Sequence, residues 1–235
     1  MRSIRLEHSA RIAVDTYELY MFWAVVVLAI SLVVRGAVFV FTDDVGMIEV
    51  NADSLLRGFS QVFALVVGIV NGVYAVRYFV RQGVTRRSFF LGGVLAGIAI
   101  AVSLQVIALM LVVGASLLEQ TLPLQIVADG SGLLVSSLMR ITITFSFFVM
   151  GWIIGFSFCR FKALGGFAAV LAGLIVMGVL VSIWGEGVYV SIMGLTIPPI
   201  DGLSLGLSFA ATVVVLAGQL VTLYLFVRNA PLAVQ

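Results

Sequence analysis

The sequence predicts an all-α membrane protein that forms a single transmembrane domain of six helices. Hydrophobic residues make up 62% of the 235 residues and charged residues only 10%, whereas soluble domains carry about 25% charged residues. The apolar residues also gather in long runs, and a run of about 18 is long enough to cross a hydrocarbon core. These two observations favour a multi-pass membrane protein.

Six apolar runs define the predicted spans. They do not alternate between polar and apolar residues, as the strands of a membrane barrel do, so we expect helices. Only the stretch Cys159-Arg160-Phe161-Lys162 separates the fourth run from the fifth. The predicted spans are residues 21–41, 55–78, 89–118, 133–158, 163–184 and 203–227.

The charged residues fall on opposite sides of this six-span map. Most of the 13 basic residues lie in the N-terminal segment, in the loops after the second and fourth spans, and near the C-terminus. Most of the 11 acidic residues lie in the other loops. Because cytoplasmic loops carry an excess of Lys and Arg, both termini are predicted to be cytoplasmic.

Two segments fit no span. Residues 1–20 precede the first span, and within them residues 8–20 are expected to lie along the cytoplasmic interface as an amphipathic elbow helix. A solvated tail is the alternative. Residues 187–200 are apolar but too short to cross, and Pro198-Pro199 would break a helix there. We therefore expect a re-entrant outer segment before the sixth span.

The loop between the second and third spans contains the stretch RQGVTRRSFFLGG, residues 81–93. Thr85 is a predicted helix N-cap, because its side-chain oxygen can accept from first-turn amides. Arg86 and Arg87 would then project from a short helix parallel to the membrane, with Phe89 and Phe90 at the interface. Such a stiff basic knob suits a partner's groove, whereas a plain topology anchor is the alternative.

Residues 83–92, GVTRRSFFLG, resemble the segment between spans two and three in permeases of type 2 ABC exporters. The shared pattern is glycine, a β-branched residue, Ser or Thr, Arg, a basic residue and one variable residue, followed by aromatics and glycine. The six-span layout, the elbow and the re-entrant segment fit the same family. The residues that the resemblance assigns to a coupling helix are Gly83, Thr85, Arg86, Arg87, Phe89 and Phe90.

The resemblance also implies partners. The coupling helix would bind cytoplasmic ABC ATPase subunits, and a second permease subunit, identical or related, would complete a two-fold translocation path. The chain has no G-x-x-x-x-G-K-[ST] phosphate-binding loop. ATP and Mg are therefore expected to bind to the partner ATPase, and no cofactor is expected in this chain. The chain is expected to lie in a bacterial plasma membrane and to contact membrane lipid. It is not expected to bind nucleic acid.

Catalytic chemistry is not expected. The chain has a single histidine, His8, and a single cysteine, Cys159. A zinc site built from clustered histidines and a Ser-His pair are therefore both excluded from the spans. No carboxylate pair lies within a predicted span. We expect neither an enzyme nor a metal site in this chain.

Polar residues at membrane depth are costly and are often functional. Arg35 can alternatively snorkel toward the acidic residues that follow the first span, and Arg140 can be interfacial. The three amides either line a path or form hydrogen bonds between helices, and both interpretations remain open. The candidate path residues are Arg35, Asn71, Gln105, Arg140 and Gln219.

Small residues recur at four-residue spacing in two of the predicted spans. Such stripes allow helices to approach closely, either within one subunit or across a dimer seam. The stripes are Gly93, Gly97 and Ala101 in the third span, and Gly165, Ala169 and Gly173 in the fifth.

The expected function is that of the membrane subunit of an ATP-driven exporter. Its apolar walls would suit a hydrophobic or amphipathic substrate, such as a peptide, a lipid-like molecule or a drug, moved by alternating access. The alternative is a six-span membrane sensor or accessory protein that has no ATPase partner.

Overall fold

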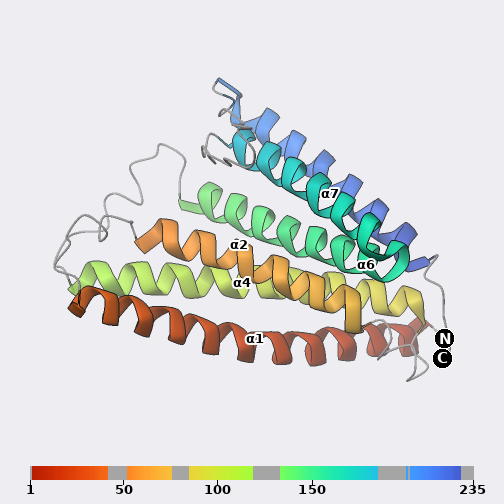
Figure 1. Ribbon diagram of the computed structural model, residues 1–235, viewed down its shortest axis with the longest axis horizontal. Helices are drawn as coiled ribbons and strands as arrows, with labels where there is room; N and C mark the ends of the chain where they lie inside the picture. Colours follow the sequence, from red (N-terminus) through yellow and green to blue (C-terminus); the bar gives the residue numbers. More distant parts are fainter. Residues whose placement is uncertain are drawn as a thin grey trace.

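The computed structural model describes residues 2–41, 52–75, 85–118, 133–184, 200 and 202–228. Within these ranges the chain is helical and contains no strand, so the all-α prediction is confirmed (Figure 1). The elements are α1 (Arg2–Phe41), α2 (Ala52–Val70), the π-helix η2 (Asn71–Ala75), α4 (Arg86–Leu118), α6 (Leu133–Ile183) and α7 (Leu205–Arg228).

Five helices in the described part of the chain are long and apolar enough to cross a membrane. Many of their outward side chains are large and apolar, such as Leu164 and Val214, which are 88% and 71% exposed. Faces of this kind fit contact with lipid, so the helices are compatible with a multi-pass membrane protein. The five apolar stretches are Ile12–Ile30, Arg57–Tyr74, Arg86–Leu111, Val135–Ile183 and Leu205–Arg228.

Helix α6 consists of two antiparallel arms. The backbone leaves helical geometry at Lys162, where φ is 59° and ψ is −155°. We call residues 133–161 the first arm and residues 163–183 the second arm; Figure 1 shows the chain reversing between them. The break lies in the stretch that was predicted to separate the fourth and fifth spans. That each arm crosses the bilayer stays a prediction.

Contacts on both sides of the bend show that the arms pack against each other. The rings of Phe158 and Phe167 meet edge to face, with centroids 5.9 Å apart. Further from the bend, a Cβ added to Gly173 would lie 2.8 Å from Cε of Met150. The two arms therefore form a closely packed helical hairpin.

A separate elbow helix is not observed. Helix α1 runs unbroken from Arg2 to Phe41, and the apolar stretch found among its described side chains, Ile12–Ile30, includes residues that precede the predicted start of the span at 21. The reason is packing: Ile12, Thr16 and Tyr20, spaced one turn apart, are all buried. Tyr17 shares a hydrogen bond of 2.8 Å with Ser103 of α4. Residues 12–20 therefore belong to the bundle.

A separate short helix between the second and third spans is not observed either, in the residues described from 85 onward. The N-cap at Thr85 is confirmed, because its Oγ1 accepts a hydrogen bond of 3.2 Å from the amide of Ser88. It also donates to the Ser88 hydroxyl at 2.9 Å. However, the helix that begins at Arg86 continues without a break to Leu118. The basic stretch is thus the first turn of α4.

A backbone-to-backbone contact joins α2 and η2 to the first arm of α6. It is made by Gly68 and Gly72 on one side and by Gly151 and Gly155 on the other. A Cβ added to Gly68 or to Gly151 would lie 2.1 Å from a backbone carbonyl oxygen of the facing helix. Only glycine permits this approach, and small residues serve the same purpose in membrane helices generally.

The predicted small-residue stripes pack within the chain where the structure resolves their neighbours. A Cβ on Gly93 would meet the indole ring of Trp152, and one on Gly97 would meet the ring of Phe148. Gly173 faces the first arm of α6, as described above. A Cβ added to Gly165 would instead meet the side chain of Phe161, which lies just before the bend at Lys162. For Gly93, Gly97 and Gly173, packing within the subunit is the interpretation that the structure supports.

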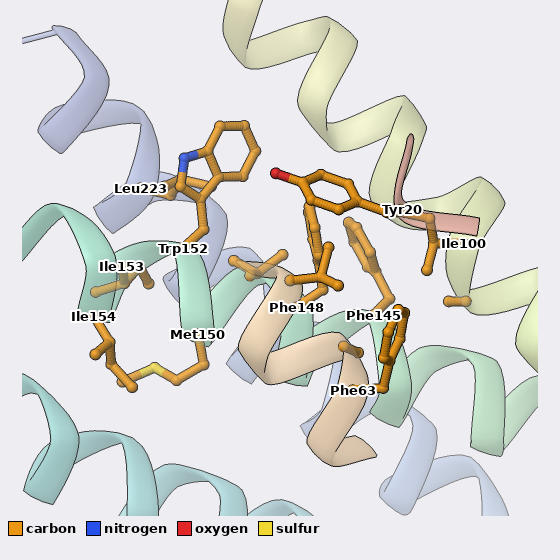
Figure 2. Packing of buried hydrophobic residues seen from close by; sticks show 14 of the residues in the cluster. Tyr20, Phe63, Ile100, Phe145, Phe148, Met150, Trp152, Ile153, Ile154 and Leu223 are labelled. Carbon is orange, nitrogen blue, oxygen red and sulfur yellow. The ribbon is translucent and has the colours of Figure 1, made fainter. Parts of the chain in front are cut away.

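Trp152 lies at the centre of the main apolar cluster and is fully buried. Its ring packs edge to face against Phe89 and Phe148, with centroid distances of 5.4 and 5.8 Å. Figure 2 shows it beside Leu223 of α7. One side chain therefore contacts α4, α7 and its own arm.

The predicted re-entrant segment covers residues 187–200, of which residues 187–199 lie outside the described residues. Its last predicted residue, Ile200, is described, and its amide donates a 3.1 Å hydrogen bond to the carbonyl of Ser182. The sixth span, predicted at 203–227, is confirmed as a helix at Leu205–Arg228.

The glycine contact predicts a sharp positional effect. Gly151→Ala should lower the free energy of unfolding by about 3 kcal/mol, since the new methyl group meets backbone that cannot rotate away. Gly218→Ala is the matched control, because no atom of the described residues lies within 4 Å of its added Cβ. Thermal unfolding of the purified variants in detergent measures both. Equal melting temperatures for the two variants would contradict the contact.

The bend at Lys162 predicts stabilisation by glycine. A side chain at this φ is strained by about 1–3 kcal/mol, and glycine carries no such strain. Lys162→Gly should therefore melt at a higher temperature than the parent protein, whereas Lys162→Ala, which loses the same charge but keeps a Cβ, should not. The idea fails if both substitutions shift the melting temperature equally.

Candidate functional site

One end of the bundle gathers basic residues, and we call it the basic end. The bend of α6 and the end of α7 meet there, where the rings of Phe161 and Phe226 lie 6.1 Å apart. Helix α4 begins at the same end, because Arg86 hydrogen-bonds to the last residue of α7. Figure 1 places the start of α1 there as well. The basic residues of this end whose side chains the structure describes are Arg86, Arg87, Arg160, Lys162 and Arg228.

The two arginines of the first turn of α4 have different surroundings. The guanidinium of Arg86 donates to the carbonyl oxygen of Arg228. A cation at this place also interacts favourably with the negative end of the α7 dipole. Arg87 and Thr85, in contrast, are exposed. Of the predicted partner-binding residues, these two present their side chains to the surroundings, whereas Arg86 joins α4 to α7.

The two phenylalanines face the bundle. Phe89 is only 1% exposed and packs on Trp152. Phe90 meets the ring of Tyr224 on α7 at 5.5 Å. These rings therefore anchor the first turn of α4 to its neighbours. That they also contact a partner stays a prediction. Gly83 lies outside the described residues.

A second polar region lies far from the basic end. It is a cavity of about 10 Å³, enclosed by α2, α4 and the first arm of α6, which is about the space of one water molecule. At about 1.5 Å per residue, Gln105 lies about 28 Å along α4 from Arg86, and Arg140 lies about 33 Å along the first arm from Lys162. The polar residues that line this polar cavity are Arg57, Ser60, Gln61, Gln105, Arg140 and Thr144.

The polar cavity brings together two of the predicted path residues, Gln105 and Arg140. Sequence reasoning missed the other four. The sequence did contain one feature that could have pointed to Arg57. Like Arg140, it is among the few basic residues that the six-span map places away from the cytoplasmic side. Ser60 and Thr144 carried no such signal, since hydroxyl residues often hydrogen-bond to their own helix. Both are buried here, at 7% and 5% exposure.

The other predicted path residues lie elsewhere. Gln219 accepts a 2.7 Å hydrogen bond from the hydroxyl of Ser146, so it ties α7 to α6. Asn71 is only 1% exposed, at the start of the π-helix η2, and among the described residues neither atom of its amide group has a hydrogen-bond partner. Short π-helical turns often occur at functional sites. Arg35 belongs to α1, but its side chain is not among those that the structure describes.

An apolar groove opens between α1 and α2. Its volume is about 470 Å³, which is within the usual size range for ligand sites. Helix α1 packs mainly on α4, and this leaves the side of α1 that faces α2 partly uncovered. The lining residues are aromatic and aliphatic, among them Tyr20, Trp23, Phe59, Phe63, Val66 and Val70. The groove therefore suits a hydrocarbon chain or another apolar group.

Comparison with protein-family models, with curated proteins and with solved structures finds no match for this chain. In the described residues, no group of three or more His, Cys, Asp and Glu side chains is placed to hold a metal ion. The features that bear on function are thus the basic end, the polar cavity and the apolar groove.

The unpartnered amide of Asn71 predicts an increase in stability on its removal. A buried polar group without a partner costs about 1–3 kcal/mol, which an apolar side chain of similar volume avoids. Asn71→Leu should therefore raise the melting temperature in detergent. Ser146→Ala is the control with the opposite sign, because it deprives the buried amide oxygen of Gln219 of its donor. A lower melting temperature for Asn71→Leu would show that the amide is satisfied.

Proposed function

We propose that this chain is the membrane subunit of an ATP-driven exporter for hydrophobic or amphipathic molecules. The observation that carries the proposal is the start of α4. Thr85 caps a helix whose exposed Arg87 offers a fixed positive charge, and the turn behind that charge is anchored to two other helices. Such a turn suits a groove with an acidic rim on a cytoplasmic ATPase.

The anchoring of this turn gives the proposal a mechanism. A push on Arg87 would act on α4 directly, because the docking turn and the span form one continuous helix. The hydrogen bond from Arg86 would pass the movement to α7, and the ring contact of Phe89 would pass it to α6. ATP binding to the partner would then change the relative stability of two arrangements of the bundle.

The apolar groove supports the class of substrate. A molecule dissolved in the membrane would reach a groove between two helices sideways, and walls of Tyr20, Trp23, Phe59 and Phe63 would hold its apolar part. A second permease subunit, identical or related, belongs to the same proposal. The second arm of α6 offers a surface for it, since Leu164, a strongly exposed apolar residue, lies there.

The proposal is tested by reversing one charge. Arg87→Glu should reduce the amount of ATPase that co-purifies with the chain, and the ATP hydrolysis of that preparation, at least tenfold, as expected for a like charge placed against an acidic rim. The fold should survive, because the side chain is exposed. Arg160→Glu is the matched control, since it makes the same change at an exposed site of the same end.

Two outcomes would contradict the proposal. If no polypeptide with a phosphate-binding loop accompanies the parent protein from its native membrane, the chain is better described as a sensor or accessory protein. If Arg87→Glu and Arg160→Glu both retain full ATP hydrolysis, the start of α4 is a topology anchor.

A further inference from the structure

The polar cavity is lined by groups that donate hydrogen bonds. Each arginine has five N–H donors in a planar fork that matches a carboxylate or a phosphate. The side-chain amide of Gln105 and the hydroxyl of Thr144 add further donors, and both lie on the walls of the cavity. The set therefore suits a ligand rich in acceptors.

The charge of the walls points the same way. Arg57 and Arg140 come from different helices and line the same small cavity, and none of the described residues that line it is acidic. An anionic group in the cavity could accept hydrogen bonds from both guanidinium groups, in addition to the contacts that the two side chains already make.

The size of the cavity limits what enters it. A volume of about 10 Å³ leaves room for part of one small group, not for a whole molecule. The remaining wall residues, Ala108 and Ile143, are apolar. Arg57 and Arg140 are only partly buried, so their long side chains can move aside to admit a charged group. The site would thus receive a single anionic group at the end far from Arg86.

From this arrangement we propose that the polar cavity binds one anionic group, a carboxylate or a phosphate. Within the proposed function, this group would be the charged head of the exported molecule, and that identification rests on the proposed function. The binding itself does not, because a free small anion would satisfy the same donors.

The test measures anion binding to the purified protein in a neutral detergent, followed by thermal unfolding. Inorganic phosphate and acetate, each replacing chloride at constant ionic strength, probe a free ion. Decyl phosphate probes an anionic head on a chain, with decanol as its neutral counterpart. At least one anionic probe should raise the melting temperature, and decanol should not reproduce its effect.

The variants assign the effect to the cavity. Arg57→Gln and Arg140→Gln should each weaken the apparent affinity for that probe at least about tenfold, as expected for loss of one charge-assisted hydrogen bond. Arg160→Gln makes the same change at the basic end and should bind as the parent does. Gln105→Leu and Thr144→Val remove donors without changing the charge, and they serve where an arginine variant fails to fold.

The outcomes separate cleanly. Stabilisation by phosphate or acetate that the cavity variants lose identifies a free-ion site, and stabilisation by decyl phosphate alone identifies a head-group site. The inference is overturned if no anionic probe stabilises the protein, or if the cavity variants and Arg160→Gln respond as the parent does. Neither an ATPase nor transport enters the measurement, so its failure leaves the proposed function standing, and the reverse also holds.

Discussion

The close approach of two pairs of glycines, Gly68 and Gly72 against Gly151 and Gly155, is the contact on which the rest of the bundle depends. Apolar side chains gain little by leaving lipid for another helix, so membrane helices associate mainly through packing and polar contacts. Backbone against backbone is the tightest packing available. It sets α2 directly on the first arm of α6, and α6 in turn carries the residues that hold α4 and α7.

Around this contact the two ends of the molecule differ in character. Toward the basic end, aromatic rings around Trp152 fill the space between the helices. The hydrogen bond from Arg86 to Arg228 joins α4 to α7 at that end. Toward the other end, polar side chains of α2, α4 and α6 meet instead, and they leave a small cavity. Tight aromatic packing suits the transmission of movement, whereas a polar cavity suits the recognition of charge.

The sequence predicted the helices well because apolar runs of sufficient length leave little other choice in a membrane. It did not predict that α1 continues unbroken through residues 12–20, because hydropathy measures affinity for lipid and does not register contacts such as the hydrogen bond between Tyr17 and Ser103. It named two small-residue stripes, but not the four glycines of the contact between α2 and α6. Every helix here carries small residues at four-residue spacing, and which of them meet depends on how each helix is rotated. For the same reason Gln105 and Arg140 were recognised singly, but not as neighbours.

The hairpin form of α6 has a consequence for how the chain acquires its structure. The two arms are joined through a bend with non-helical geometry at Lys162, so their contacts connect residues that are close along the chain. Contacts between close neighbours require little loop-closure entropy and form early. During synthesis the hairpin can therefore assemble as soon as its second arm emerges, before α7 exists. Helix α2, which is synthesised earlier, can then pack against Gly151 and Gly155 of the formed hairpin. Assembly would therefore proceed outward from the middle of the sequence toward both ends.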